Sequence, residues 1–490
     1  MQNAEWTGLF TIANLAKPKP KKLNAKTQRR KDAKQTEIIL CSLSLLWLIF
    51  LSFVPENNWL GTKIRWLWRL PIVILTCLLI ACSTPTATPT PIAEKLDNAA
   101  NAVILATATP LPVPTPTPEL AAGHLVLWHS WAEAEGDALA EILTNFQQQY
   151  PKLTVDTLFV AYDDLAANYA EAVQSGGGPD LILAGNSSLR DLAEKDTVLG
   201  LDDLLPLAVQ SDYWPAALDN MRWNGKLYGL PTDFKTISLF YNRSLVDANA
   251  LPTTTDALLA LAQESRFSGV GLYASLYHLY WGFPAYGARL MDENGKVVLD
   301  QTGNPADFLR WLNAIHQLPG SYVDSDYGML LDRFKKQEFG FLVDGPWAID
   351  ELRGALGDDL AVTLLPAGPA GPAQPWLTAD GLFLNPRTAP AQQQRALLLA
   401  RYLTSAESGA VLTRVARKLP ANRNASVGDD AILQGFMQQA ASAQALPARP
   451  EMDEVWGYGG DLLLRTLGGE EEPTTILSET VTLINEANGR

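Results

Sequence analysis

The chain of 490 residues contains few cysteines and few histidines. Its three cysteines are Cys41, Cys77 and Cys82, so everything after residue 82 lacks both a thiol and a disulfide. A domain of this size buries enough apolar surface to need no disulfide. The four histidines, at positions 124, 129, 278 and 316, form no close pair and have no cysteine beside them. This pattern argues against a transition-metal site.

The sequence has no surplus of basic residues outside its N-terminal part. Of 38 Lys and Arg residues 12 precede residue 83, whereas only 4 of the 53 Asp and Glu residues do. Residues 83–490 therefore carry a net charge of −23, which argues against a nucleic-acid partner. The sequence also lacks G-x-x-x-x-G-K-[ST], G-x-S-x-G and H-E-x-x-H. It therefore offers neither a nucleotide-phosphate loop nor a familiar hydrolytic motif.

The stretch that ends at Cys82 is typical of an export signal. Basic residues at positions 63, 65 and 69 precede an uncharged apolar run, Leu70–Ala81, which ends on a small residue and Cys82. This arrangement resembles the lipobox of bacterial lipoproteins. The resemblance implies that residues 63–81 are a signal peptide and that Cys82 carries two acyl chains, enough to hold a protein on a membrane. The alternative is a short buried helix with an accidental cysteine.

Two further segments flank this signal. Residues 1–62 contain nine Lys and Arg between positions 17 and 34 and a second apolar run, Ile38–Val54, long enough for a membrane span. Because a lipobox belongs near the start of a chain, we expect residues 1–62 to be a mis-called start or an unrelated extension. A hairpin of two membrane segments is the alternative. Thr/Pro-rich tracts within residues 82–122 predict an extended, solvated linker.

The globular part alternates strands with helices from its first residues. Apolar patterning predicts strands at residues 124–131, 153–160 and 180–184, with helices at 134–150 and 163–174 between them. This order predicts an α/β fold with a doubly wound sheet. In such sheets ligands bind beyond the carboxyl ends of the strands.

Six segments add a resemblance to this pattern. They are LWHSWAEAEGDAL, FQQQYPKLTV, GGGPDLILAGNS, YGLPTDFKTISLFYNRSLV, DGPWAIDEL and RPEMDEVWGYGGDLL. In this order they resemble the family 1 extracellular solute-binding proteins, which include the maltose- and maltodextrin-binding proteins of ABC importers. The likeness runs from residue 125 to residue 490. It implies a monomeric, non-enzymatic receptor that binds a carbohydrate, such as an oligosaccharide, without a cofactor and delivers it to the permease subunits of an ABC transporter.

The resemblance also implies a periplasmic-binding-protein fold of two lobes. Each lobe is a sheet flanked by helices, and hinge strands join the two. Two extended runs, Thr236–Asn242 and Thr378–Leu384, are the expected crossings. They place lobe one at residues 123–235 plus 380–425 and lobe two at residues 236–379 plus 426–490.

A sugar site combines aromatic rings, which stack on the C–H faces of the sugar, with polar groups that bond its hydroxyls. Matching the family motifs gives four tryptophans as candidate stacking platforms: Trp131, Trp281, Trp347 and Trp456. The other candidates are two tyrosines, four polar side chains and a glycine that lets backbone approach the ligand: Tyr162, Tyr280, Asn186, Asp233, Asp344, Asp380 and Gly381.

Several of these residues have an ordinary structural alternative. Trp131 could be a core residue and Trp456 a structural helix residue. Asn186 could be a helix cap and Asp233 part of a turn. One of Tyr280 and Trp281 belongs in the core, and Trp281 is the favoured platform.

Two other classes of function stay open at this stage. An exported glycoside hydrolase would need two carboxyl groups about 5–10 Å apart, and the many Asp and Glu residues do not exclude such a pair. A receptor for a polyamine or a peptide would share the fold. Strong dependence of binding on salt would indicate a polyamine receptor, and little dependence a sugar receptor.

Overall fold

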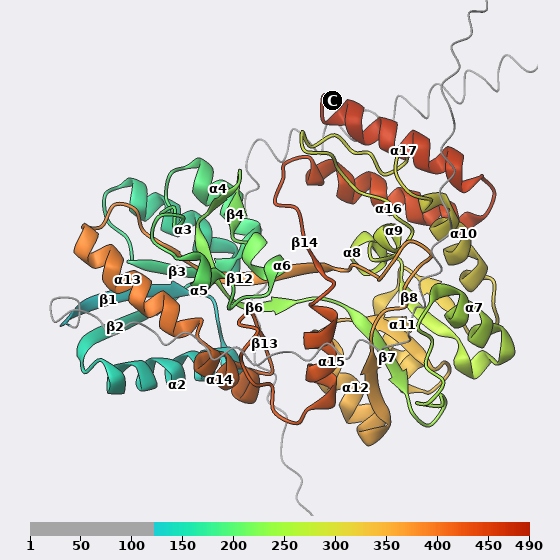
Figure 1. The fold of residues 1–490 in the computed structure, drawn as a ribbon, viewed down its shortest axis with the longest axis horizontal. Helices are drawn as coiled ribbons and strands as arrows, with labels where there is room; N and C mark the ends of the chain where they lie inside the picture. Colours follow the sequence, from blue (N-terminus) through green and yellow to red (C-terminus); the bar gives the residue numbers. More distant parts are fainter. Residues whose placement is uncertain (1–121) are drawn as a thin grey trace, which may run out of the picture. The chain divides into compact units, whose positions relative to one another are not determined.

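The computed structural model describes residues 122–490 (Figure 1). The proposed extension, the signal peptide, Cys82 and the linker up to residue 121 lie outside the described residues. Between residues 122 and 490, no helix has both the length and the apolar character needed to cross a bilayer.

The first sheet contains seven strands, which we call sheet 1. Its path runs β13-β6-β12-β3-β1-β2, and β14 pairs with β12. Strands β1 and β2 are parallel, as are β1 and β3, whereas β12 runs antiparallel to both β3 and β6. The bounds are β1 (Ala122–His129), β2 (Lys152–Phe159), β3 (Leu181–Gly185), β6 (Gly229–Lys235), β12 (Trp376–Leu384), β13 (Leu419–Pro420) and β14 (Gln444–Ala445).

The strands and helices predicted at the start of the domain are confirmed. Helix α2 (Glu133–Gln149) joins β1 to β2, and α3 (Tyr162–Gln174) joins β2 to β3. Helix α2 buries Ala138, Ile142 and Phe146 at helical spacing. The other helices that belong with sheet 1 are α4 (Leu189–Glu194), α5 (Leu207–Gln210), α6 (Pro215–Asp219), α13 (Pro390–Leu403), α14 (Ala406–Ala416) and the 3-10 turn η1 (Asn186–Ser188), beside the small hairpin of β4 (Arg222–Trp223) and β5 (Lys226–Leu227).

The second sheet, sheet 2, has the order β11-β7-β10-β8-β9. Its strands are β7 (Ser238–Asn242), β8 (Val270–Tyr273), β9 (Tyr322–Asp324), β10 (Phe341–Asp344) and β11 (Leu360–Thr363). Its longer helices are α7 (Thr255–Glu264), α10 (Pro305–His316), α11 (Tyr327–Lys335), α12 (Ile349–Leu356), α15 (Ala431–Gln439), α16 (Met452–Gly468) and α17 (Pro473–Ala487). Short turns are α8 (Leu276–Leu279), α9 (Gly282–Ala285), η2 (Arg266–Ser268), η3 (Pro346–Ala348) and η4 (Gly357–Asp359).

The chain passes between the two sheets at several points (Figure 1). Strand β6 ends at Lys235 and β7 begins at Ser238, so the first passage is shorter than the expected run of residues 236–242. The hydrogen-bond ladder explains this, because β7 pairs with β10 and β11 over its whole length. Strand β12 likewise pairs within sheet 1 from its first residue, and residues 364–375 form the passage before it. The division into lobes at 235/236, 379/380 and 425/426 stays a prediction.

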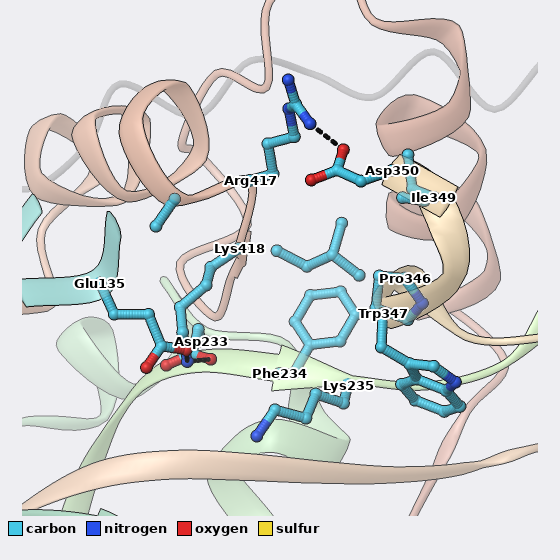
Figure 2. Close-up of a pocket in the computed structure, with 12 residues that line it drawn as sticks. Glu135, Asp233, Phe234, Lys235, Pro346, Trp347, Ile349, Asp350, Arg417 and Lys418 are labelled. Atoms are coloured by element: carbon cyan, nitrogen blue, oxygen red, sulfur yellow. Dashed lines mark hydrogen bonds and ion pairs between the residues drawn. The ribbon is translucent and has the colours of Figure 1, made fainter. Parts of the chain in front are cut away.

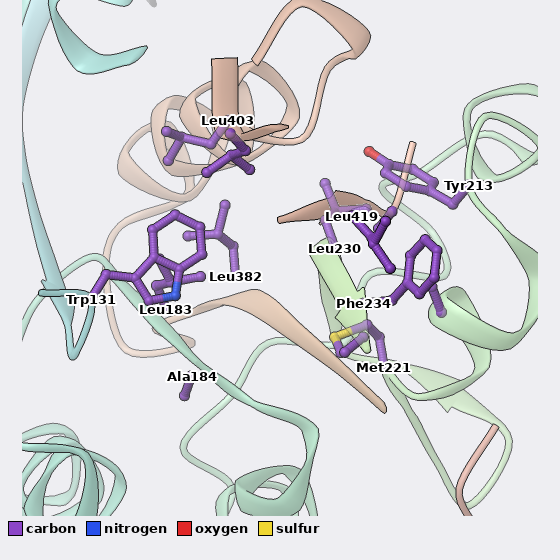
Figure 3. Close-up of a cluster of buried hydrophobic side chains, with 14 of the residues drawn as sticks. Trp131, Leu183, Ala184, Tyr213, Met221, Leu230, Phe234, Leu382, Leu403 and Leu419 are labelled. Carbon is purple, nitrogen blue, oxygen red and sulfur yellow. The ribbon is translucent and has the colours of Figure 1, made fainter. Parts of the chain in front are cut away.

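A buried apolar cluster underlies the strands next to these passages (Figure 3). It includes Trp131, Phe234 and Leu382, all at most 5 % exposed. Gly381 lies beside it at a bulge in the β12–β6 ladder. A Cβ atom on Gly381 would lie 2.3 Å from Sδ of Met221. Packing against Met221 therefore requires this glycine, and the space beside it is not open to a ligand.

Candidate functional site

Two cavities adjoin the end of strand β6, where Lys235 lines both. The first, cavity A, has a volume of about 230 Å³ and is shown in Figure 2. Its lining includes Glu135, Asp233, Lys235, Trp347, Asp350 and Lys418. The second, cavity B, has a volume of about 350 Å³. Its lining includes Tyr162, Asn186, Arg190, Asp380, Arg449 and Trp456.

A buried lysine, Lys418, contacts carboxylates on two neighbouring strands of sheet 1, β6 and β12. The ammonium group of Lys418, the residue before β13, lies 2.7 Å from Oδ2 of Asp233 on β6 and 3.1 Å from Oδ2 of Asp380 on β12. It also lies 3.0 Å from Oε1 of Glu135 at the start of α2. The side chain of Lys418 is 8 % exposed and that of Asp233 is 1 % exposed. Figure 2 shows Lys418 reaching down to Asp233 and Glu135.

Opposite effects act on the pKa values of this network. Burial would lower the pKa of Lys418, but the charges of Asp233, Asp380 and Glu135 outweigh it and raise this pKa above its ordinary value. Burial would raise the pKa of Asp380, but Lys418 and Lys235 outweigh it and lower this pKa. For Asp233, burial prevails over Lys418 and raises the pKa. These shifts favour the charged forms of Lys418 and Asp380.

The same lysine occupies one face of Trp131. Its Nζ atom lies 4.7 Å from the centre of the indole ring, a cation–π contact. Trp131 is 5 % exposed, and its indole helps to lower the pKa of Asp380. In this conformation Trp131 is a core residue that supports the charged network, which was the alternative to a stacking platform.

Trp347 supplies the exposed aromatic surface of cavity A. It follows β10 in the turn η3 and is 45 % exposed. Its Nε1–H donates to the hydroxyl of Tyr327 at 3.0 Å, and its ring lies edge-on to His278 at 5.8 Å. One face of a half-exposed, tethered indole is suited to stacking on a flat apolar ligand surface.

Trp456 supplies an exposed aromatic surface of cavity B. It lies in α16, is 39 % exposed and packs edge-on against Trp376 at 5.3 Å. Trp376 in turn stacks on Tyr280, with ring centres 3.9 Å apart. Tyr280 is 3 % exposed, so it supports the aromatic group from behind and does not line either cavity.

Tyr162 and Asn186 lie at the other side of cavity B. Tyr162 is 61 % exposed, and its hydroxyl lies 3.2 Å from Oγ of Ser187. Asn186 begins η1 and donates from Nδ2 to Oδ1 of Asn220 at 2.6 Å. Its side chain makes no capping hydrogen bond in η1 or α4, which was the alternative reading.

Besides Trp131 and Tyr280, three predicted site residues are not on a wall of either cavity. Trp281 is fully buried and lies edge-on to both Phe308 and Trp311 in the core behind sheet 2. Asp344 is fully buried and bonds the protein on both oxygens. Gly381 faces Met221. The structure thus brings together Asp233, Asp380 and Trp347 near cavity A, and Tyr162, Asn186, Asp380 and Trp456 around cavity B.

The sequence analysis did not single out Lys418, Lys235 or Tyr327. A weak signal for Lys418 was present: two candidate carboxylates lie at or beside the expected crossings, and buried carboxylates require a cation. Nothing in the local pattern shows which lysine supplies it, because Lys418 is 38 residues from Asp380 and 185 from Asp233.

An ion pair crosses each cavity between elements of the two sheets. Arg417, after α14, pairs with Asp350 of α12 beside cavity A (Figure 2). Arg190 of α4 lies 3.7 Å from Asp453 of α16 beside cavity B. Both cavities are therefore lined by side chains from both sheets, as a ligand site between two lobes requires.

Comparison with known proteins decides the family. The model of the bacterial extracellular solute-binding protein family matches residues 130–410. The chain belongs to this family. This solute-binding protein is 24 % identical over 334 residues to a maltooligosaccharide ABC transporter solute-binding lipoprotein of Streptococcus pneumoniae, covering 64 % of this chain and 77 % of that one. It is 21 % identical to a galactooligosaccharide-binding protein of Bacillus subtilis, covering 72 % and 87 %.

Solved structures share the fold of this solute-binding protein. A cyclo/maltodextrin-binding protein in complex with maltotetraose superposes with a TM-score of 0.66 at 21 % identity, covering 76 % of this chain and 98 % of that one. A cyclic alpha-maltosyl-1,6-maltose binding protein from Arthrobacter globiformis gives a TM-score of 0.66 at 17 % identity, covering 74 % and 98 %. The predicted α/β fold of a binding protein with two sheet-and-helix lobes is confirmed.

Proposed function

We propose that this solute-binding protein is a membrane-tethered receptor for a maltooligosaccharide-like carbohydrate, which it delivers as a monomer to the permease of an ABC importer. The observation that carries the proposal is the pair of half-exposed tryptophans, Trp347 and Trp456, in two cavities that share Lys235. Two stacking rings at a distance from each other suit a ligand of several sugar units. The names of the relatives from Streptococcus and Bacillus support an oligosaccharide.

The charges around the cavities support a neutral ligand over a polyamine. Cavity A is lined by Lys235, Arg417 and Lys418 as well as by three carboxylates. Cavity B has Arg190, Lys235 and Arg449 beside Asp380 and Asp453. A polycation would meet as many positive as negative groups at these walls, whereas sugar hydroxyls can bond to both.

Binding is tested by unfolding the intact protein with and without maltotetraose. At a free concentration 100 times the Kd, a single-site ligand adds about 2.7 kcal/mol to the free energy of unfolding. We expect such a rise with maltotetraose, little change of affinity between low and high salt, and no rise with spermidine. A rise with spermidine and none with any oligosaccharide would contradict the carbohydrate proposal and leave the fold assignment intact.

We also propose that the protein releases its ligand chemically intact. Asp233 and Asp380 are held by a buried lysine, so neither is placed as the free acid that glycoside hydrolysis needs. Chromatography of maltotetraose after prolonged incubation with the protein should recover the intact tetrasaccharide. Appearance of shorter sugars would favour the glycoside hydrolase.

The lipid tether is a separate part of the proposal, because Cys82 lies outside the described residues. We expect Cys82→Ala to move the protein from the membrane fraction to the soluble fraction and to abolish incorporation of labelled palmitate. Cys77→Ala, a neighbouring cysteine within the apolar run, serves as the matched control and should leave both unchanged. Membrane retention of Cys82→Ala without label would point to one of the two apolar runs before Cys82, Ile38–Val54 or Leu70–Ala81, as the anchor.

A further inference from the structure

The strongest unexplained feature of the site is the buried carboxylate of Asp344. It directly precedes the turn that carries Trp347 and is fully buried at the end of β10. Its Oδ2 accepts a hydrogen bond from the hydroxyl of Tyr327 at 3.0 Å, and its Oδ1 accepts one from the backbone N–H of Gly345 at 2.7 Å. Neither oxygen is available to a ligand.

Tyr327 links the carboxylate of Asp344 to the indole of Trp347 by two hydrogen bonds. Its hydroxyl donates to Asp344 and at the same time accepts from Nε1–H of Trp347 at 3.0 Å. Burial, and then the charge of Asp344, raises the pKa of Tyr327, so the hydroxyl keeps the proton that it donates. The direction of both hydrogen bonds is therefore fixed, from the indole to the phenol to the carboxylate.

Gly345 fixes the ring of Trp347 from another side. A Cβ atom at position 345 would lie 2.2 Å from ring carbons of Trp347, so the indole packs directly on the glycine backbone. In residues 344–347, Asp344 accepts the hydrogen bond of Tyr327 and Gly345 leaves room for the indole. Pro346 begins the turn η3, and Trp347 carries the ring.

We propose that Asp344 and Tyr327 are positioning residues that set the orientation of Trp347, and that Tyr327 requires a carboxylate and not an amide at position 344. The inference rests on the proposed function only in assigning Trp347 to the ligand. An asparagine at 344 has one acceptor oxygen for two donors, Tyr327 and the N–H of Gly345. Whichever way the amide is turned, one of these donors loses its acceptor, and an unpaired buried donor is costly.

His278 lies on the remaining side of the carboxylate. Its Nδ1 is 2.8 Å from Oγ of Ser275, while its Nε2 has no hydrogen-bond partner among residues 122–490 and lies 3.7 Å from Oδ1 of Asp344. This ring fills space beside Trp347 and Tyr327 but does not replace either hydrogen bond.

The test is a double-mutant cycle on the intact protein with Asp344→Asn, Tyr327→Phe and both together. Each single variant should weaken binding of maltotetraose about tenfold, and the double variant little more than either one, because the two residues act through the same ring. Tyr286→Phe, which removes another bonded hydroxyl packed behind sheet 2, is the control and should leave affinity unchanged. Effects that multiply in the double variant would overturn the proposal.

A second measurement needs no ligand. With 15N-labelled tryptophan indoles, the Trp347 resonance is assigned by its absence in Trp347→Phe. It should shift and exchange its proton faster with water in Tyr327→Phe and Asp344→Asn, but not in Tyr286→Phe. An unchanged resonance would refute the proposal that Tyr327 and Asp344 orient Trp347. If the resonance shifts but the wild type binds no carbohydrate, the positioning roles of Tyr327 and Asp344 stand and the proposed function fails.

Discussion

Replacing Lys418 by methionine is expected to lower the free energy of unfolding by about 3–5 kcal/mol, the range found when one partner of a buried ion pair is removed. The change leaves Asp233 and Asp380 buried between β6, β12 and β13 without the cation that both contact. Methionine approximates the length of the lysine stem, so the loss reports the charge more than the packing. Urea unfolding followed by circular dichroism measures it.

The adjacent residue provides the matched control. Arg417 also forms an ion pair, with Asp350, but its side chain is 52 % exposed. Exposed pairs contribute about 0–1 kcal/mol, so Arg417→Ala should change the unfolding free energy within that range. A triple variant, Lys418→Met with Asp233→Asn and Asp380→Asn, should recover part of the loss because it removes the unpaired charges. Equal effects of the Lys418 and Arg417 variants would contradict the network.

The pH dependence of this difference follows from the directions of the pKa shifts. Asp380 has a lowered pKa, so its contribution is present above its unfolded value of about 3.8 and is lost as the pH falls through the folded value. Lys418 has a raised pKa, so its contribution is complete below its unfolded value and persists through neutral pH. Asp233, whose pKa is raised by burial, takes up a proton first on acidification. The gap between wild type and Lys418→Met should therefore be constant near neutrality. On acidification it should shrink first as Asp233 takes up its proton, and then below about pH 4 as Asp380 does.

Trp347→Ala is expected to weaken binding of maltotetraose by a factor of 30 or more, which corresponds to about 2 kcal/mol, the level of a binding hot spot. The reason is the loss of the stacking surface in cavity A. Because the side chain is 45 % exposed, the free energy of unfolding should change much less than affinity. Titration calorimetry of the intact protein measures the Kd.

Phe267→Ala is the matched control for this variant. Phe267 is an aromatic residue that is 41 % exposed and lines neither cavity. Its removal should leave the Kd unchanged. If Trp347→Ala bound maltotetraose as tightly as wild type while Trp456→Ala did not, the ligand would lie in cavity B alone.

The start of sheet 1 could be predicted from sequence because its signals are local. Residues 124–184 alternate strands with helices whose apolar spacing is regular, and β1, β2 and β3 follow in that order. The sequence predicted the positions of the passages between the two sheets less accurately. The run of residues 236–242 is uniformly strand-like, and only the pairing of β7 with β10 and β11 shows that Ser238 already belongs to sheet 2.

The candidate site was predictable where a motif fixes the position of a side chain. Trp347 and Trp456, which the motifs singled out, lie on cavity walls, and their contact with a ligand stays a prediction. Tyr280 and Trp281 are adjacent between two short helices, and sequence alone does not show that both point inward. Lys418, Asp233 and Asp380 meet only because β13, β6 and β12 are neighbours in sheet 1, a long-range pairing that local patterns do not contain.

The position of β12 has a consequence for synthesis of the chain. Residues 376–384 lie between β3 and β6, which come much earlier in the sequence. While the ribosome is still translating the middle of the protein, β3 and β6 lack their common neighbour, and sheet 1 stays open. Domains fold as units once their parts have emerged. Sheet 1 can therefore close only after residues 376–384 have been synthesised.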